Sequence, residues 1–402
     1  MDTETLIPLV GIVIVAALLV KAGFERLRLP PLIGYIFIGF CLRAADTHWG
    51  LLPDDAESVF GFFAKLGVIT LLFTVGLKSH PGKLVRRLKS AGLVWLGNVI
   101  MSGLIGFWAA SFLGFDFIPC LIAGVALTAT SVGIPSAIWE RTGAIETDDG
   151  QFFVEVAEMD DVSGILLLTI LFGLLPVLRD GVGESAGLAW MTLRTVGWVL
   201  LKLTLFGAAC FLFARYAETP VVRFFSRSET KTDAVISCTS LAILIAGLAD
   251  LLGFSVAIGA FFAGLAFSRN REVVENQTPY NTLCDLFVPF FFIGIGLSVP
   301  PSTLDQALIP GLLLLVAAVT GKLLGTLPVA AVIRGMGMGG AITLGVSLIP
   351  RAEISMIIME RAHRIGDWAV PGELFSAMVV VVLSTCLITP PLLVWLIRRY
   401  AK

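Results

Sequence analysis

Long runs of apolar residues, separated by short polar connections, occupy nearly the whole chain. A helix needs about 20 consecutive apolar residues to cross the hydrocarbon core of a bilayer, and about thirteen runs approach or exceed that length. They cover residues 6–22, 30–45, 59–77, 91–115, 117–139, 151–176, 187–215, 232–249, 253–268, 282–299, 306–333, 338–360 and 371–397. The pattern predicts an all-α polytopic membrane protein with about thirteen transmembrane helices.

The composition supports this fold class. Hydrophobic residues make up 57% of the 402 residues and charged residues only 14%, and a soluble domain of this size lacks the interior to bury so much apolar surface. The net charge of −2 gives no reason to expect a nucleic acid partner. The residues before the first run are acidic and lack the basic region of a signal peptide, so we expect that run to be retained. We expect a single transmembrane domain over residues 1–402, with no soluble regulatory domain.

Basic residues concentrate in alternate connections between the runs. If about thirteen helices alternate in direction, these connections all fall on one side, and the opposite connections carry mostly acidic residues. The positive-inside rule then places the N-terminus outside and the C-terminus in the cytoplasm. The basic residues concerned are Lys21, Arg26, Arg28, Lys78, Lys83, Arg86, Arg87, Lys89, Arg215, Arg223, Arg227, Lys231, Arg269, Arg271, Arg398, Arg399 and Lys402.

Two adjacent carboxylates, Asp160 and Asp161, interrupt the apolar run 151–176. At ~1.5 Å per helical residue they lie about 15 Å from its start, near the middle of the hydrocarbon core. An ionised carboxylate at that depth costs about 2.5–3.5 kcal/mol on insertion scales, and two neighbouring ones repel each other. Such a site is stable when it holds protons or a cation, which is typical of a transporter that exchanges the two.

The order of the runs predicts an inverted repeat. With thirteen helices, six on each side of a linking seventh run in opposite directions, as in many secondary transporters. The approximate repeats cover residues 6–176 and 232–397, and residues 187–215 form the linking helix.

Two runs at matching positions in these repeats are interrupted by residues that break helices. Proline removes a backbone donor, and glycine, serine and threonine tolerate unwinding. An ordinary proline kink would explain either interruption alone, but the matched pair favours broken helices that present free carbonyls and half-helix dipoles near the membrane midplane. The crossover residues are Thr130, Ser131 and Pro135 in the run 117–139, and Pro350 in the run 338–360.

Further charged residues fall inside apolar runs. Lys322 lies near the middle of the run 306–333, and we expect it to pair with one of the two aspartates, either as a structural salt bridge or as a proton carrier. Arg351 is always charged, so it fixes geometry, and Glu353 pairs with a facing base or caps exposed amides. Glu155 and Glu158 precede the aspartates and line a predicted cytoplasmic funnel for cations, unless they are solvated residues near the interface.

The sequence gives no sign of a cofactor or a resident metal. The six cysteines are scattered through apolar runs without a CxxC pair, and the three histidines lie in connections without ligand spacing.

Six motifs together resemble the monovalent cation/proton antiporters of the sodium/hydrogen exchanger superfamily, in its NapA- and Kef-like branch. The resemblance extends from about residue 30 to residue 390. The motifs are Asp160-Asp161-Val-Ser-Gly with the preceding Thr128-Ala-Thr-Ser-Val-Gly, Pro31-Leu-Ile-Gly-Tyr-Ile-Phe-Ile-Gly, Gly67-Val-Ile-Thr-Leu-Leu-Phe-Thr-Val-Gly-Leu, Ile258-Gly-Ala-Phe-Phe-Ala-Gly-Leu, Pro289-Phe-Phe-Phe-Ile-Gly-Ile-Gly-Leu and Ser347-Leu-Ile-Pro-Arg-Ala-Glu.

The resemblance implies roles for the charged residues. Asp161 takes the place of the ion- and proton-binding aspartate, and Asp160 that of its neighbour, which is an aspartate in electrogenic relatives. Lys322 matches the lysine that pairs with this neighbour. Arg351 and Glu353 match a Pro-Arg-Gly-Glu signature, in which Ala352 here replaces the glycine.

Other departures from the family pattern are Pro135, Lys65, Glu155 and Glu158, and they bear on ion selectivity and stoichiometry more than on fold. The resemblance also implies an NhaA-like fold with a core and a dimerisation domain, a homodimer in the cytoplasmic (inner) membrane of a prokaryote, and no Kef-type nucleotide-binding domain. A separate regulatory subunit is left open.

The predicted function is exchange of a monovalent cation, Na⁺ first, for H⁺ by alternating access at the aspartate pair, and the protein is not expected to be an enzyme. A K⁺/H⁺ antiporter, a K⁺ efflux pathway gated by a partner, and a non-transporting sensor or assembly subunit remain alternatives. An intramembrane aspartyl protease is excluded, because adjacent helical residues point ~100° apart and cannot share a water molecule.

Overall fold

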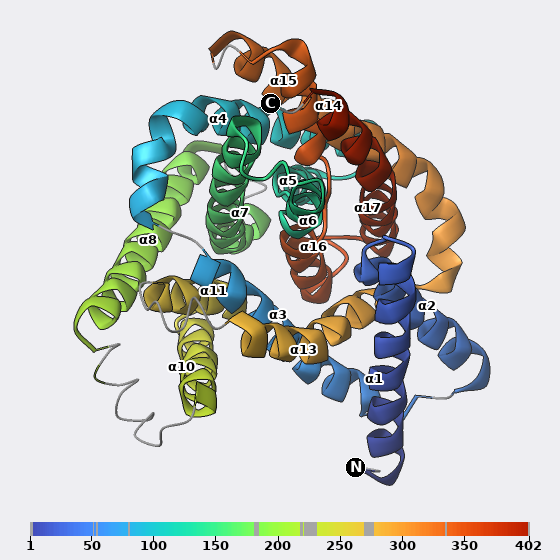
Figure 1. Cartoon of the computed structure of the whole chain (residues 1–402). Helices are drawn as coiled ribbons and strands as arrows, with labels where there is room; N and C mark the ends of the chain where they lie inside the picture. Colours follow the sequence, from blue (N-terminus) through green and yellow to red (C-terminus); the bar gives the residue numbers. More distant parts are fainter. Residues whose placement is uncertain are drawn as a thin grey trace. The chain divides into compact units, whose positions relative to one another are not determined.

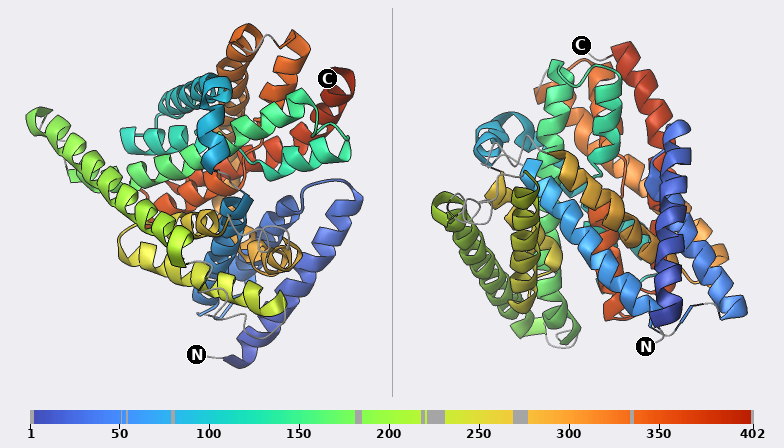
Figure 2. Two further views of the ribbon diagram at one scale, coloured as in Figure 1. Left: turned by 60° about the vertical axis from the view of Figure 1, so that its left-hand side comes forward. Right: turned by 60° about the horizontal axis from the view of Figure 1, so that its bottom comes forward.

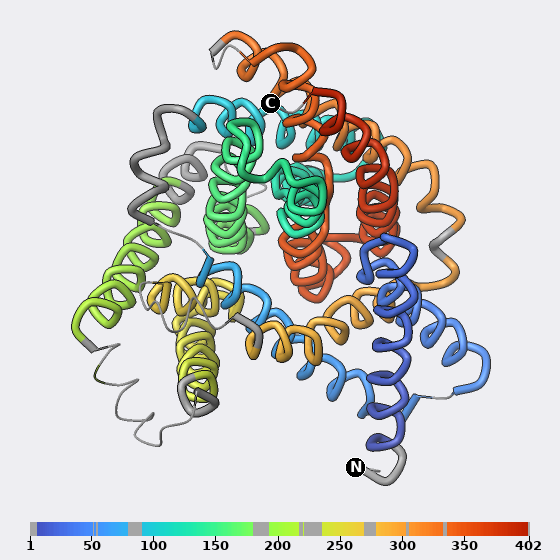
Figure 3. Tube along the Cα trace, viewed as in Figure 1, coloured from blue at the N-terminus to red at the C-terminus, as the bar shows by residue number. Residues whose placement is uncertain are grey.

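The computed structural model describes residues 3–50, 52–53, 55–78, 81–180, 185–217, 220, 231–268, 277–333 and 336–400, and Figure 3 traces their course. The regular secondary structure of these residues is helical throughout. Each of the apolar runs predicted from the sequence coincides with a helix or, at the two predicted breaks, with a pair of helices. Four arginines that support the predicted orientation lie outside the described residues: Arg223, Arg227, Arg269 and Arg271.

Figure 1 shows the helices of the described residues in the order of the chain. Their bounds are α1 Thr3–Arg26, α2 Pro31–Trp49, α3 Ala56–Lys78, α4 Pro81–Phe112, α5 Phe117–Thr128, α6 Gly133–Arg141, α7 Asp148–Asp180, α8 Ser185–Leu212, η1 Phe213–Ala217, α10 Lys231–Leu251, α11 Val256–Phe267, α13 Gln277–Leu297, η2 Pro301–Thr303, α14 Leu304–Ile333, α15 Met338–Ser347, α16 Glu353–Ile365 and α17 Gly372–Tyr400.

Among the described residues, 9 helical spans are long and apolar enough to cross a membrane, with the pair α5–α6 counted as one span. Large apolar side chains are exposed along them, for example Ile7 and Leu19 on α1 and Leu205 on α8. Apolar side chains that face outward on long helices are suited to lipid rather than water. The chain is therefore a multi-pass membrane protein, and the larger count of thirteen spans stays a prediction.

One compact unit comprises Met1–Val20, Tyr35–Pro81 and Phe172–Gly296. Within it, α3 packs closely against α11 because glycines meet at the contact, and the views in Figure 2 show the helices of this region from two further sides. A side chain at Gly76 would collide with the backbone of α11, and one at Gly264 would collide with that of α3. Small residues allow this close approach of membrane helices.

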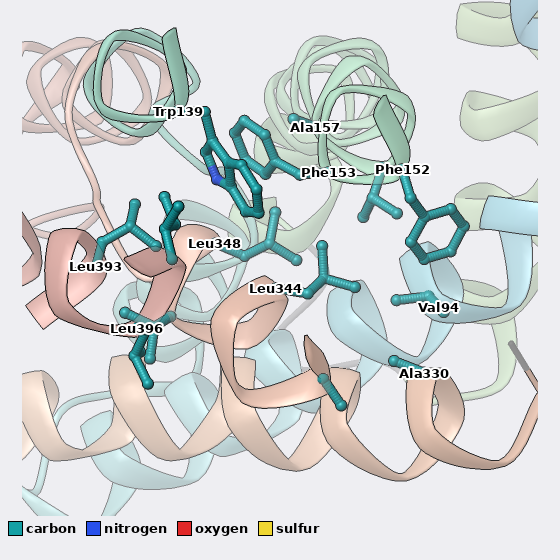
Figure 4. Packing of buried hydrophobic residues seen from close by; sticks show 14 of the residues in the cluster. Val94, Trp139, Phe152, Phe153, Ala157, Ala330, Leu344, Leu348, Leu393 and Leu396 are labelled. Atoms are coloured by element: carbon teal, nitrogen blue, oxygen red, sulfur yellow. The ribbon is translucent and has the colours of Figure 1, made fainter. Parts of the chain in front are cut away.

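The second compact unit comprises Lys21–Gly34, Gly82–Leu171 and Leu297–Lys402. Its apolar core joins α6, α7, α15 and α17, as Figure 4 shows. Trp139 stacks on Phe153 with ring centroids 5.9 Å apart, and the Trp139 indole N–H donates to the Ser347 hydroxyl over 3.0 Å. This core therefore fixes the half-helices α6 and α15 to each other and to α7.

Glycines also bring α4 and α14 together in the second unit. A Cβ atom added at Gly325 would lie 2.7 Å from Cα of Asn98, and one added at Gly321 would lie 2.9 Å from Cα of Ser102. The two backbones thus pass at a distance that excludes side chains. This close approach positions the polar residues of both helices at the same level of the unit.

Two helices of the second unit are broken, as the sequence predicts. The first break joins α5 to α6, and Ala129 within it has extended backbone angles, φ −67° and ψ 144°. The second break joins α15 to α16 and contains Pro350. Pro135 was predicted at the first crossover, but it lies in the first turn of α6. Proline is tolerated there because the first turn of a helix has no intrahelical partner for its N–H groups.

Candidate ion-binding site

The carboxylate of Asp160 lies at the centre of the second unit and is completely buried. Lys322 Nζ on α14 lies 3.0 Å from Asp160 Oδ2, and the Thr130 hydroxyl donates to the same oxygen over 2.6 Å. Asn98 Nδ2 on α4 donates to both oxygens, over 2.9 Å to Oδ1 and 2.8 Å to Oδ2. A buried charge is tolerated when it is paired and hydrogen-bonded, and Asp160 meets both conditions.

Lys322 connects this carboxylate to the first helix break. Its ammonium group is fully buried and donates over 2.7 Å to the carbonyl oxygen of Thr128, the last residue of α5. The carbonyl groups at a helix C-terminus lack intrahelical partners and carry the negative end of the helix dipole. Lys322 therefore neutralises both the end of α5 and the charge of Asp160.

Arg351 links the two breaks to each other. Its Nη1 donates to the carbonyl oxygen of Ala129 over 2.6 Å and lies 3.3 Å from that of Leu348. Arg351 is fully buried, and its backbone N–H and carbonyl are held by Thr385 and Cys386 on α17. The sequence led us to expect that Arg351 fixes geometry and that Glu353 pairs with a facing base or caps exposed amides. In the described residues Arg351 donates to backbone carbonyls of both breaks, and the role of Glu353 stays a prediction.

Asp161 differs from its neighbour in both exposure and contacts. It is partly accessible, and among the described residues its carboxylate has no side-chain hydrogen bond. The carboxylates of Glu353, Asp160 and Glu158 are close enough to repel its charge. Ser131 lies in the first break, and its buried hydroxyl is close to the carboxylate of Glu353. Asp161 thus has a carboxylate available for a ligand at a place where several negative charges favour a cation.

The predicted funnel residues Glu155 and Glu158 lie on α7 and are both partly accessible. Both have further interactions within the described residues. Glu158 lies one turn before Asp161, so it is the better placed of the two to act on the ion. The funnel itself stays a prediction.

Sequence reasoning brought out Asp160, Asp161 and Lys322 but missed Asn98. The signal was an isolated amide side chain in the apolar run 91–115. A polar residue in a membrane helix faces the protein interior more often than lipid, so this position warranted attention.

Comparisons with known proteins show the family of this chain. The family described as "Sodium/hydrogen exchanger, transmembrane" matches residues 13–399. The chain belongs to the sodium/hydrogen exchanger family. Membership of this family makes it a monovalent cation/proton antiporter rather than an enzyme.

Three known transporters show how similar this chain is to its relatives. The chain is 26% identical to the high-affinity Na⁺/H⁺ antiporter NhaS3 of a Synechocystis strain, and the aligned region covers 97% of this chain and 91% of NhaS3. It is 26% identical to the Na⁺/H⁺-K⁺ antiporter GerN of Bacillus cereus, with coverage of 92% and 90%. Identity to the glutathione-regulated potassium-efflux protein KefC of Salmonella schwarzengrund is 31%, over 80% of this chain and 50% of KefC.

The fold has a counterpart among solved structures. The sodium proton antiporter MjNhaP1 of Methanocaldococcus jannaschii matches over 100% of both chains with a TM-score of 0.70 and 16% sequence identity. At this identity the likeness concerns the fold alone.

Proposed function

We propose that this antiporter exchanges Na⁺ for protons at Asp161, with Asp160 paired to Lys322 before the cation binds. The observation that carries the proposal is the contrast between the two carboxylates. Asp160 accepts hydrogen bonds from Asn98, Thr130 and Lys322, whereas Asp161 is partly accessible and lies beside other carboxylates. A cation therefore finds its available carboxylate at Asp161 rather than at Asp160.

The exchange follows from competition for the same oxygens. Deprotonated Asp161 binds the cation, assisted by the buried hydroxyl of Ser131 and by carbonyl groups that the first break releases. After the site opens to the other side, the cation leaves and protons rebind. Because a proton and a cation cannot occupy the site at the same time, transport of one in one direction requires transport of the other in the opposite direction.

The site lies entirely within the second compact unit. That unit contains α4, α5–α6 and α14–α17, together with most of α7. We propose that it is the mobile core implied by the family resemblance. Thirteen spans in an inverted repeat, a homodimer, and a cytoplasmic C-terminus belong to the same proposal.

We propose two protons per cation, and hence transport that carries charge. In this scheme cation binding breaks the Asp160–Lys322 pair, and Lys322 releases the second proton. If Lys322 stays paired with Asp160, one proton is exchanged per cation. A voltage imposed across the liposome membrane changes the rate in the first case and leaves it unchanged in the second.

K⁺ is the second candidate ion. GerN and KefC, by their names, act on potassium, and both are relatives of this chain. The oxygens near Asp161 are set on a broken helix, and such a flexible set does not fix a cavity size for one ion.

Reconstitution in liposomes tests the function. Internal pH is followed with a dye under an imposed proton gradient while Na⁺, K⁺ or Li⁺ is added, with wild type beside Asp161→Asn. Cation-dependent proton movement that Asp161→Asn abolishes supports antiport and identifies the ion. Asp305→Asn, an exposed carboxylate in the first turn of α14, serves as the control and should retain activity.

Absence of cation-dependent proton movement in folded wild-type protein would contradict the proposal. Cation current without proton coupling would indicate a channel or an efflux pathway gated by a partner. If the protein shows neither proton-coupled exchange nor cation current, it is a sensor or an assembly subunit.

A further inference from the structure

Among the side chains that the structure describes, Asn98 is the one that donates to both oxygens of the Asp160 carboxylate. Thr130 and Lys322 both act on Oδ2, so that oxygen has three donors when Asn98 is included. Among the described residues, the side-chain donor to the other oxygen, Oδ1, is Asn98. Asn98 is therefore the contact that prevents the carboxylate plane from turning.

The orientation of the Asn98 amide is defined by this contact. Its Nδ2 faces two carboxylate oxygens, and the reverse orientation would place Asn98 Oδ1 against them. Asn98 is completely buried, and its Oδ1 has no hydrogen-bond partner within the part of the chain that the structure describes. An unsatisfied buried acceptor costs about 1–3 kcal/mol, so the contact with Asp160 must offset a real penalty at this position.

We infer that Asn98 is a positioning residue that fixes Asp160 against Lys322 and thereby reserves Asp161 for the transported cation. This inference rests on the proposed function. It assigns to α4 a part in selecting which carboxylate meets the ion.

The physical reason lies in the freedom of the groups that Asn98 restrains. The last torsion of an aspartate side chain has a broad energy minimum, so a carboxylate held at one oxygen turns easily. Lysine is a compact point charge on a flexible stem, and Lys322 follows its partner. Once Asp160 turns, the ammonium group is free to approach the neighbouring Asp161. It then competes with the cation for that carboxylate.

Helix packing gives Asn98 the rigidity that this task requires. Gly325 of α14 lies one turn from Lys322 and packs against Asn98 of α4. No side chain of the described residues separates the two backbones at this point. Asn98 and Lys322 are thus set at a fixed spacing on two closely packed helices, and both contact Asp160. A residue on a mobile loop could not fix an oxygen position in this way.

The test compares Asn98→Ala with Ser102→Ala in the liposome assay. Ser102 is a matched control because it lies one turn further along α4, is equally buried, and has a hydroxyl without a partner. We expect Asn98→Ala to raise the apparent KM for the cation by roughly tenfold, the lower end of the effect seen when a residue that orients a metal ligand is removed. The kcat should stay within about twofold, because the competing amine is displaced at saturating cation. Ser102→Ala should leave KM unchanged.

A double-mutant cycle separates positioning from folding. In the Asp160→Asn background there is no carboxylate to fix, so Asn98→Ala should add no further change in KM. Cation binding is also measured without transport, as the rise in the unfolding temperature of detergent-solubilised protein with NaCl against choline chloride. This second readout applies to variants that have lost activity.

Two results would overturn the inference. One is a lower kcat or lower thermal stability with unchanged KM and unchanged NaCl dependence, which marks a purely structural residue. The other is an equal shift in the Asp160→Asn background. If wild type moves no protons with any cation, the proposed function fails, and the NaCl-dependent stabilisation alone then decides on Asn98.

Discussion

The backbone N–H of Ser131 donates to the carbonyl oxygen of Pro350 over 2.8 Å, so the two helix breaks are bonded directly to each other. These residues are more than 200 positions apart in the chain, and each lies in a segment that cannot satisfy its own backbone groups. Buried backbone groups must find partners, and here one break supplies them for the other. The crossing is therefore a structural unit in which a change at one break alters both.

Arg351 should be essential to this crossing. Arg351→Ala removes the donor to Ala129 and Leu348, and among the described residues it leaves the buried carbonyl of Ala129 without this side-chain donor, while that of Leu348 keeps the Thr130 hydroxyl. Each unsatisfied group costs about 1–3 kcal/mol, so we expect a clear fall in the temperature of unfolding in detergent. Arg351→Lys should recover only part of the lost stability, because lysine lacks the planar fork of donors. Equal stability of Arg351→Ala and wild type would contradict this role.

Lys322 should contribute to stability as well as to transport. Lys322→Ala leaves Asp160 buried without its opposite charge, and breaking such a pair costs about 3–5 kcal/mol. The double variant with Asp160→Asn removes both charges and should be more stable than Lys322→Ala alone. The unfolding temperatures of wild type, Lys322→Ala, Asp160→Asn and the double variant measure this difference in stability. Additive losses in the double variant would show that the pair is not the cause.

The glycines between α4 and α14 should tolerate no side chain. At Gly325, an added Cβ would lie 2.5 Å from the carbonyl oxygen of Gly97 and 2.7 Å from Cα of Asn98. Gly325→Ala must push the helices apart, and overpacking of this kind costs about 1–3 kcal/mol. Gly247→Ala on α10 is the matched control, because nothing lies within 4 Å of the added Cβ. We expect lower stability and lower transport for Gly325→Ala only, measured by thermal unfolding and the liposome assay.

The sequence predicted the apolar spans and both breaks because proline, glycine and intramembrane charge act locally. It also predicted a partner for Lys322, since a buried lysine without one is too costly. It placed the start of one helix too late: α4 begins at Pro81, whereas the apolar run begins near residue 91. Hydropathy reports the apolar part of a helix, and the lysines and arginines before it are good helix formers that extend it.

The contacts of Asn98, Arg351 and Thr130 could not be predicted in the same way. Each joins segments distant in the chain, and hydropathy contains no information on which faces of two helices meet. Arg351, for example, donates to the carbonyl oxygens of Ala129 and Leu348, one in each break. The roles of Asp160, Asp161, Glu155, Glu158 and Glu353 in transport stay predictions.

The pH dependence of transport tests the competition at Asp161. If protons and cations compete for this carboxylate, lowering the pH must raise the apparent KM for the cation while kcat at saturating cation stays the same. Where the protonated form dominates, one competing proton raises KM by about tenfold per pH unit, and two competing protons raise it by about a hundredfold. The slope therefore reports how many protons the cation displaces. Asp305→Asn should show the wild-type slope. A KM that is independent of pH, with a kcat that falls on acidification, would place the titrating group outside the cation site.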